Sequence, residues 1–502
     1  MTPNVTEKRL DERFVHAWKG KEDEDCLWWQ GEWWSWNRLN VLADDCEEKL
    51  RDAGLERGQR IALLLPNSPM VFAICVAVWR LGAAVAPLNA RAGVFNLLST
   101  IKMLDVNAVF VPQEKLGASS EMEKESGIPV LGADTVTPLN KCRMRQGGIE
   151  SNDIAVIFST SGTSGNPKAV PCTHKNLTTN VDDCIPAAKG LVSDDSVFLN
   201  VLPNFHAFGF TAAGLLPIMN GVRQAVVPTF VPVDNTITAI KGAGVNAIIA
   251  VPTLLAFILG ALAKKNEILS GMKFVICGGD KLNPDMDARC QKYLGIGILE
   301  GYGLTECSPV VAFNPSMKRR KLGTVGPKFN ALETQIRDRE GRLIDLHEEG
   351  VLWLKGASVV DGYFRDEENT AERFKGGWFN TGDVVRIDDD GYIRIVDRAT
   401  DIIIVSGFNV YPQEVEATLR KHPAVKAAVA VGEKNNVAGE LVKAFIILED
   451  GRTATPKELM DYCKEHLAHY KVPRKIGFVT EYPLSPAGKI LRRELRKIKI
   501  TK

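Results

Sequence analysis

Short apolar runs alternate with longer mixed segments over about residues 58–242, and this alternation limits the folds open to the chain. Residues 60–65, 107–111 and 154–158 are apolar runs of the length of buried strands. The segments between them are long enough for crossover helices, which parallel strands require. Further strands are expected at 225–227, 247–251 and 273–277. The pattern predicts an α/β body built from βα units around mainly parallel sheets.

The pattern of apolar and polar residues changes after about residue 322. Short alternating strands with Gly and Asp turns follow, as in 351–354 and 388–395, and they predict a β-rich, hairpin-containing subdomain over about 322–397. A compact α+β pattern comes next. We therefore expect an N-terminal domain over 1–397 and a small mobile α+β C-terminal domain over 398–502, which is within the usual size of a domain.

Composition excludes several classes of partner. The chain has 62 Lys and Arg against 61 Asp and Glu and lacks a long basic tract, so we expect no nucleic-acid partner. Its ten cysteines contain no C-x-x-C pair, which argues against a zinc site or a disulfide framework and favours a cytoplasmic protein. We expect neither a secretory signal nor a transmembrane segment, while peripheral membrane contact stays open.

Five of the nine tryptophans lie within residues 26–36. Gly31 stands in the middle of this run, where a hairpin would turn. Aromatic strands that pack onto the core are therefore favoured over a stacking surface for bases or sugars. We assign these tryptophans no function.

A loop rich in Ser, Thr and Gly follows the strand expected at 154–158. Its glycines let the backbone fold around an anion, its hydroxyls can donate to phosphate oxygens, and Lys168 adds a positive charge. A Walker P-loop is excluded, because Pro167 and Ala169 replace its last Gly and its hydroxyl residue. The loop predicts a triphosphate cradle made of Thr160, Ser161, Gly162, Thr163, Ser164, Gly165 and Lys168.

Together with five further motifs, this loop resembles the superfamily of adenylate-forming enzymes, which includes acyl-CoA ligases, peptide-synthetase adenylation domains and luciferases. The motifs are PNFH at 203–206, EGYGLTE at 300–306, WFNTGD at 378–383, DR at 397–398 and PAGKILR at 486–492. They stand in the order of the family and span nearly the whole chain. The resemblance implies an enzyme that activates a carboxylic acid with ATP.

The motif at 301–306 has residue types suited to a nucleotide. Gly301 and Gly303 permit close backbone approach, and Tyr302 offers a face to adenine. Thr305 can bond a phosphate, and Glu306 supplies the oxygen ligand that Mg²⁺ prefers. The resemblance implies that this motif binds ATP and that Glu306 holds the metal.

The resemblance extends to residues around the adenine and the ribose. Gly278, Gly279 and Asp280 are implied to line the adenine edge, with a plain β-turn as the alternative. Asp383 is implied to accept hydrogen bonds from the ribose hydroxyls, and Arg398 to make a second ribose contact.

Two residues are implied to act at the reacting end of the substrates. Attack of a carboxylate on the α-phosphate brings two anions together, so an enzyme must supply a cation there. The resemblance implies that Lys489 is this cation and that it is mobile. It also implies that His206 gates the acyl pocket, where the alternative is a satisfied core histidine. Thr400 replaces the usual Lys or Asp of the hinge, which we still expect at 398–401.

The second half-reaction is also suggested by the resemblance. Residues 406–416 and 470–473 are similar to fatty acyl-CoA ligases, which implies transfer of the acyl group to CoA with Gly407 near the pantetheine tunnel. We therefore expect an AMP-forming acyl-CoA synthetase that uses ATP, Mg²⁺ and CoA. Small residues at 207–214 favour a medium- or long-chain fatty acid, with an aryl acid as runner-up. An acyl-[acyl-carrier-protein] ligase, a luciferase-like oxidative enzyme and a non-catalytic nucleotide-binding protein are the alternatives.

Overall fold

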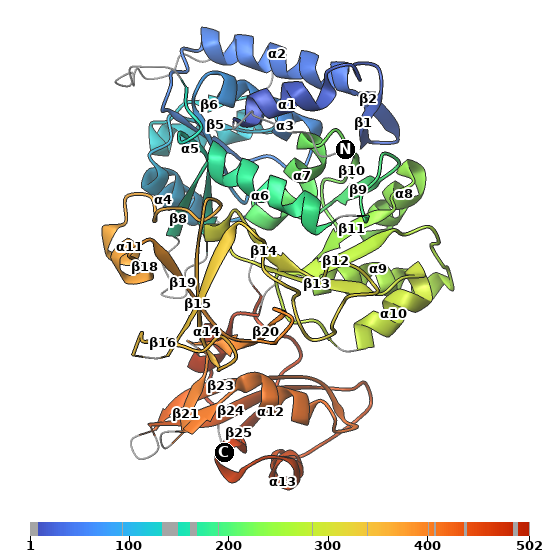
Figure 1. Cartoon of the computed structure of the whole chain (residues 1–502), viewed down its shortest axis with the longest axis vertical. Helices are drawn as coiled ribbons and strands as arrows, with labels where there is room; N and C mark the ends of the chain where they lie inside the picture. Colours follow the sequence, from blue (N-terminus) through green and yellow to red (C-terminus); the bar gives the residue numbers. More distant parts are fainter. Residues whose placement is uncertain are drawn as a thin grey trace. The chain divides into compact units, whose positions relative to one another are not determined.

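The structure is a computed structural model of the 502-residue chain. It describes residues 9–92, 94–132, 149–160, 168–188, 190–283, 285–338, 340–399, 401–405, 408–435, 439–484 and 490–500. The chain forms two compact units (Figure 1). Unit 1 is Met1–Thr334, Leu354–Phe379 and Asp390–Tyr392, and unit 2 is Gln335–Trp353, Asn380–Asp389 and Ile393–Lys502.

Unit 1 contains a sheet of eight described strands in the order β14-β13-β12-β11-β9-β10-β1-β2. Its strands are β1 (Asp25–Trp29), β2 (Glu32–Ser35), β9 (Val197–Asn200), β10 (Arg223–Val226), β11 (Ala247–Ala250), β12 (Phe274–Gly278), β13 (Ile298–Gly303) and β14 (Val310–Phe313). From β13 through β1 every neighbouring pair is parallel, and only the pairs at the two edges are antiparallel. The α/β class is confirmed.

Helices follow the strands of this sheet, as crossovers between parallel strands require. They are the π-helix η3 (Phe208–Leu215) and α7 (Leu216–Met219) after β9, α8 (Val233–Ala243) after β10, α9 (Pro252–Lys265) after β11 and α10 (Asp285–Leu294) after β12. The helix α6 (His174–Ala187) precedes β9. The helix α9 begins at Pro252, whose fixed φ and missing N–H suit the first helical turn. Its buried residues, Leu254, Leu255, Ile258, Leu259 and Leu262, recur at helical spacing and form one apolar stripe.

A second sheet of unit 1 has the order β6-β5-β3-β4-β7-β8. Its strands are β3 (Arg60–Leu63), β4 (Ala84–Pro87), β5 (Ala108–Phe110), β6 (Val130–Leu131), β7 (Ile154–Thr160) and β8 (Lys168–Thr173), and its helices are α2 (Trp36–Asp52), α3 (Pro69–Arg80), α4 (Val94–Leu104) and α5 (Ser120–Ser126). Its pairs are parallel except β7 with β8. The strands expected at 60–65, 107–111 and 154–158 are therefore confirmed.

The N-terminal hairpin and helix pack against the rest of unit 1. Gly31 takes a φ of 98° between β1 and β2, and Trp28 is buried beside Gly242, so the predicted aromatic hairpin is confirmed. The helix α1 (Leu10–Trp18) contacts α3, α6 and α7 (Figure 1). The Leu10 N–H donates to His174 Nδ1 at 3.2 Å. Burial lowers the pKa of His174 to about 4, which keeps this acceptor nitrogen unprotonated.

The predicted strand-rich region has the strand order β16-β15-β17-β19-β18, with β20 on β19. Its strands are β15 (Leu332–Arg337), β16 (Leu343–Ile344), β17 (Gly350–Gly356), β18 (Phe374–Lys375), β19 (Trp378–Ile387) and β20 (Ile393–Arg398), and the helix α11 (Glu367–Arg373) precedes β18. The pair β19–β20 is antiparallel, as the hairpin expected around 388–395 requires.

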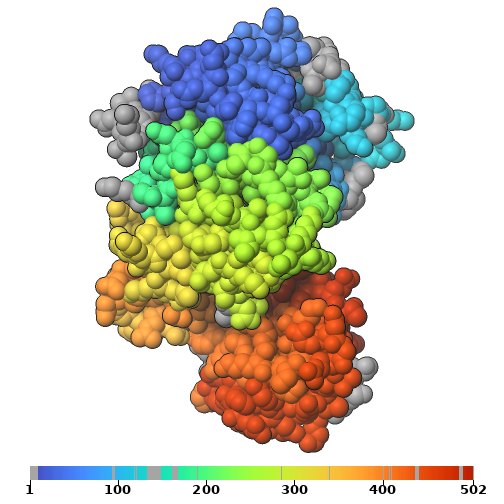
Figure 2. All heavy atoms as spheres, turned by 90° about the vertical axis from the view of Figure 1, so that its right-hand side faces the viewer, coloured from blue at the N-terminus to red at the C-terminus, as the bar shows by residue number. Residues whose placement is uncertain are grey.

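The last part of unit 2 is a small α+β body, whose residues after about 400 fill the orange-red part of Figure 2. Its strands are β21 (Ile403–Val405), β22 (Phe408–Val410), β23 (Val425–Asn435), β24 (Gly439–Leu448) and β25 (Lys475–Phe478), and its helices are α12 (Pro412–Leu419), α13 (Pro456–His466) and α14 (Arg492–Lys497). The helix α13 starts with a capping box between Thr455 and Glu458. Among the described helices of the chain, none is long and apolar enough to cross a membrane.

Candidate active site

The described ends of the predicted triphosphate cradle lie opposite each other in unit 1. Thr160 is the last residue of β7 and Lys168 the first of β8, and the antiparallel register pairs them directly. The Thr160 hydroxyl donates to the Lys168 carbonyl at 3.3 Å. The other cradle residues, Ser161, Gly162, Thr163, Ser164 and Gly165, lie outside the described residues. The two strands therefore fix where the loop leaves and re-enters the sheet.

Lys168 is 8% exposed, and it forms no ion pair within the described part of the chain. Its ammonium lies 4.8 Å from the centre of the Tyr363 ring. The Tyr363 hydroxyl donates to Glu306 Oε1 at 2.8 Å. Burial, followed by the nearby Glu306 charge, raises the pKa of Tyr363, so the hydroxyl keeps its proton as a donor. The structure thus links Lys168 and Glu306 through a tyrosine that sequence reasoning missed.

The glycines of the motif at 301–306 are packed against the protein's own backbone. A Cβ on Gly303 would lie 2.2 Å from the Pro309 carbonyl oxygen, and one on Gly301 would lie 3.3 Å from Phe313 Cβ. The backbone that approaches these glycines most closely is that of β14 and the residue before it. Tyr302 is half-buried.

Thr305 and Glu306 begin the 3-10 helix η4 (Thr305–Cys307), directly after β13. Thr305 is 9% exposed, and its carbonyl oxygen lies 3.9 Å from Cys172 Sγ of β8. The structure therefore brings this motif to the strand that begins with Lys168.

The motif at 278–280 lies beside the motif at 301–306. Gly278 ends β12 and pairs with Gly301 of the parallel neighbour β13. A Cβ on Gly278 would approach the Gly301 carbonyl oxygen to 2.8 Å. Gly279 has a φ of 84°, and Asp280 is exposed. Both glycine motifs therefore lie at the carboxyl ends of adjacent parallel strands, where α/β folds bind ligands.

His206 lies in the turn that precedes the π-helix η3 and is half-buried. Its Nδ1 accepts a hydrogen bond from the Phe208 N–H at 3.3 Å. The Cβ that Gly279 lacks would lie 3.9 Å from the Phe208 ring. The start of η3 is therefore close to the end of β12.

Four buried amide side chains hold this turn and the π-helix, and sequence reasoning singled out only one of them, Asn204, within the motif at 203–206. They are Asn67, Asn200, Asn204 and Gln224. The Asn204 N–H donates to Asn67 Oδ1 at 2.8 Å, and the Asn204 amide donates to the Gly209 carbonyl at 3.1 Å. The Gln224 amide donates to the Gly214 carbonyl at 3.2 Å. Asn204 and Gln224 thus bond carbonyl oxygens of the π-helix directly, and Asn67 holds the backbone of Asn204.

Gly209 and Gly214 of the π-helix pack tightly against neighbouring segments. A Cβ on Gly209 would lie 2.3 Å from the Pro203 carbonyl oxygen, and one on Gly214 would lie 2.9 Å from the Phe72 ring. The space beside both glycines is filled by protein. Our argument that small residues at 207–214 leave room for an acyl chain is therefore wrong at these two positions.

Asp383 and Arg398, the two predicted ribose contacts, are cross-strand neighbours in unit 2. They pair in the β19–β20 register, and Arg398 Nε lies 2.8 Å from Asp383 Oδ1. The Asp383 side chain is 3% exposed and that of Arg398 is 44% exposed. The buried carboxylate is thus held by a cation that also faces solvent.

Asp397 precedes Arg398 and is buried. One of its carboxylate oxygens accepts the Arg398 N–H at 2.8 Å. Burial raises the pKa of Asp397 to about 6. Gly407, Lys489 and the hinge residue Thr400 lie outside the described residues.

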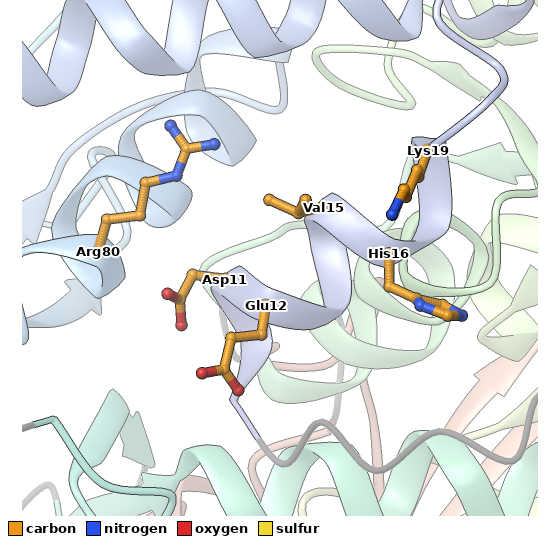
Figure 3. Close-up of a pocket in the computed structure, with 6 residues that line it drawn as sticks. All are labelled: Asp11, Glu12, Val15, His16, Lys19 and Arg80. Carbon is orange, nitrogen blue, oxygen red and sulfur yellow. The ribbon is translucent and has the colours of Figure 1, made fainter.

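No group of three or more His, Cys, Asp or Glu side chains that could hold a metal occurs in the described ranges. A cavity of about 370 Å³ lies elsewhere, lined by Asp11, Glu12, Val15, His16 and Lys19 of α1 and by Arg80 of α3 (Figure 3). Arg80 is already paired with Asp44 at 2.6 Å. This cavity contains none of the predicted site residues.

Comparison with known proteins identifies relatives over both parts of the chain. The family of AMP-binding enzymes matches residues 14–364, and the AMP-binding enzyme C-terminal domain matches residues 414–489. A long-chain-fatty-acid–CoA ligase of Yersinia pestis is 35% identical over 69% of this chain, which spans 62% of that protein. The peroxisomal OPC-8:0-CoA ligase 1 of Arabidopsis thaliana is 30% identical over 92% of this chain and 87% of its own length.

Solved structures agree with this result. The ATP-bound MatB from Rhodopseudomonas palustris has a TM-score of 0.86 at 25% identity, covering 97% of this chain and 98% of that one. The apo form of the same protein has a TM-score of 0.76 at 26% identity, covering 98% of each chain. The chain belongs to the AMP-binding enzyme family.

Proposed function

We propose that this protein is an AMP-forming acid:thiol ligase that makes an acyl-adenylate from a carboxylic acid and ATP and then transfers the acyl group to CoA. The observation that carries the proposal is the grouping of Lys168, Thr305 and Glu306 in unit 1, beside the carboxyl ends of β12 and β13. A cation, a hydroxyl and a carboxylate at the edge of a parallel sheet suit a metal-bound triphosphate.

In the first half-reaction, a carboxylate oxygen of the acid attacks the α-phosphorus of ATP, and the bond to the β-phosphate oxygen breaks to release pyrophosphate. Lys168 and the hydroxyls of the loop at 160–165 bind the phosphates in this proposal, and Thr305 adds a hydrogen bond. Lys489 offsets the charge that builds at the α-phosphate. Tyr302 and residues 278–280 contact the adenine, while Asp383 and Arg398 bind the ribose hydroxyls.

Glu306 is the proposed ligand of a Mg²⁺ ion that would offset the phosphate charge. Mg²⁺ is commonly bound by one or two carboxylates together with substrate phosphates and waters. A single carboxylate with one oxygen held by Tyr363 fits that kind of site, and the lack of a three-residue metal cluster among the described residues is consistent with it.

In the second half-reaction, the thiol sulfur attacks the acyl carbonyl carbon and AMP leaves. We propose CoA as the thiol because several relatives are named CoA ligases. Gly407 then lies at the pantetheine tunnel, after rotation about the hinge at 398–401, and His206 gates the acyl pocket. An acyl carrier protein as acceptor is the alternative.

We propose a medium- or long-chain fatty acid as the substrate, because a long-chain-fatty-acid–CoA ligase is among the relatives. An aryl acid is the second candidate, since a feruloyl-CoA synthase of Amycolatopsis is 30% identical over 89% of this chain.

The test is formation of AMP and acyl-CoA by the purified protein with ATP, Mg²⁺ and CoA, over fatty acids of increasing length and several aryl acids. The proposal predicts stoichiometric AMP and thioester, with a maximum at one class of acid. Thioester formation only with a phosphopantetheinyl carrier protein would support the alternative acceptor. Absence of AMP with every acid would refute the ligase assignment.

A further inference from the structure

Tyr363 joins the two charged side chains of the proposed nucleotide site. Its ring faces the Lys168 ammonium at 4.8 Å, while its hydroxyl donates to Glu306 at 2.8 Å. The tyrosine itself is 6% exposed. A cation is thus held on the face of the ring and an anion at its hydroxyl, which are the two electrostatically favourable positions on a tyrosine.

The backbone around Tyr363 is hydrogen-bonded to the segments that carry Glu306 and Lys168. The Val360 N–H donates to the Glu306 carbonyl at 2.9 Å, and the Phe364 N–H donates to the Ala169 carbonyl, next to Lys168, at 2.8 Å. The Tyr363 N–H itself donates to Thr370 Oγ1 at 2.9 Å. The position of the ring between the two segments is therefore set by backbone hydrogen bonds.

A buried ammonium and a nearby carboxylate attract each other strongly, because the protein interior screens charge poorly. Lys168 and Glu306 nevertheless form no ion pair. An ion pair between them would neutralise the charges that a triphosphate and its metal need. Tyr363 instead gives Lys168 a ring face, which phosphate oxygens can replace, and gives Glu306 a hydroxyl donor, which leaves its other oxygen for a metal ion.

We propose that Tyr363 is a positioning residue of the nucleotide site, which keeps Lys168 and Glu306 from pairing so that the ammonium is available to phosphate oxygens and the carboxylate to a phosphate-bound divalent cation. This inference rests on the proposed function, since it assumes that the site binds ATP.

Tyr363→Phe separates the two roles of the side chain, because it keeps the ring face and removes the hydroxyl. Binding of ATP without metal, measured by titration calorimetry in EDTA, should stay within about twofold of the wild type. Binding of ATP over a series of Mg²⁺ concentrations should need about tenfold more Mg²⁺, the effect of one lost hydrogen bond to a charged group. Neither measurement requires turnover.

Tyr363→Leu removes the ring as well, so Lys168 and Glu306 become free to pair. Metal-free ATP binding should then fall by about fivefold, because the new ion pair competes with the phosphate oxygens for Lys168. In a Glu306→Gln background the same Tyr363→Leu change should alter metal-free ATP binding by less than about twofold, because the competing charge is gone. A general folding defect would persist in that background.

Tyr392 offers a matched control within unit 1. It is also 6% exposed, its hydroxyl donates to the Arg319 carbonyl at 2.5 Å, and its ring faces the Lys321 ammonium at 4.6 Å. Tyr392→Phe and Tyr392→Leu should leave both ATP constants within about twofold of the wild type.

Two results would overturn the inference while leaving the proposed function intact. One is a Mg²⁺ requirement in Tyr363→Phe equal to that of Tyr392→Phe. The other is an undiminished effect of Tyr363→Leu in the Glu306→Gln background. Failure of the wild-type protein to bind ATP with Mg²⁺ would instead refute the proposed function, and this inference with it.

Discussion

Replacement of Arg492 by Met should destabilise unit 2 strongly. Arg492 begins α14, three positions after Lys489, and its Nη1 donates to Glu416 Oε1 and to the Ala430 carbonyl, both at 2.6 Å. Glu416 is 4% exposed, and its Oε1 also accepts the Ala430 N–H at 2.9 Å. The arginine therefore ties the end of the chain to α12 and β23.

The magnitude follows from the burial of the pair. Removal of one member of a buried ion pair costs about 3–5 kcal/mol, because the other charge is left uncompensated. The Arg492 side chain is 20% exposed against 6% for Glu416, so solvent screens part of the interaction. We therefore expect a loss of about 3 kcal/mol in the local free energy of unfolding.

Urea-dependent hydrogen exchange at the amides of β23 measures this local stability. The double variant Arg492→Met with Glu416→Gln should recover about 1–2 kcal/mol, since Gln still accepts the Ala430 N–H without a buried charge. Lys497→Met, on the same helix, is the control, because the Lys497–Glu494 pair is 70% and 36% exposed and contributes about 0–0.5 kcal/mol. An Arg492→Met effect no larger than that of Lys497→Met would refute the reasoning.

Three further changes test other parts of the structure. Gly303→Ala should lower the free energy of unfolding by more than about 3 kcal/mol, because its Cβ would overlap a backbone carbonyl. Gly279→Ala should lower it by about 1–3 kcal/mol, from the positive φ alone. Thermal melting compares the two variants, and equal effects would contradict the packing argument. Burial raises the pKa of Asp397 to about 6, so the stability of the wild type relative to Asp397→Asn should be greatest below about pH 4. This relative stability should fall by about 3 kcal/mol as the pH rises through 6. Denaturant titrations across that window measure the difference, and a pH-independent difference would contradict the reasoning. Arg398→Ala should weaken ATP binding about tenfold, because it removes a proposed ribose contact and the cation that holds Asp383. Calorimetry measures the affinity, and an unchanged value would exclude Arg398 and Asp383 from the ribose site.

Elements with strong local signals could be predicted from the sequence. The strand expected at 247–251 is β11, since a short apolar run determines it locally. The tryptophan hairpin followed in the same way from Gly31, whose positive φ suits its turn.

Contacts between distant segments could not be predicted in this way. Gly278 meets Gly301 only because β12 and β13 are neighbours, and β9 lies between β10 and β11 against the order of the chain. Periodicity gives strands but not their order in a sheet. The small residues Gly209 and Gly214 were misread for the same reason, since Pro203 and Phe72, which fill the space beside them, are not visible in a local pattern.

The candidate site shows the same division. Lys168 and Glu306 were found because they stand in motifs whose residue types suit phosphate and metal. Tyr363 stands 57 positions from Glu306, and nothing in its own neighbourhood distinguishes it from a core tyrosine. A residue that acts only by holding others apart has no local signature, so the fold is needed to find it.

Acid-dependent exchange of labelled pyrophosphate into ATP, in the absence of CoA, tests the central claim most directly. Reversible formation of an acyl-adenylate predicts exchange only when a suitable acid is present, and Lys168→Ala should slow it by about tenfold to a hundredfold at subsaturating ATP through the loss of a charged phosphate contact. Exchange without acid, or release of ADP and phosphate in place of AMP and pyrophosphate, would contradict it.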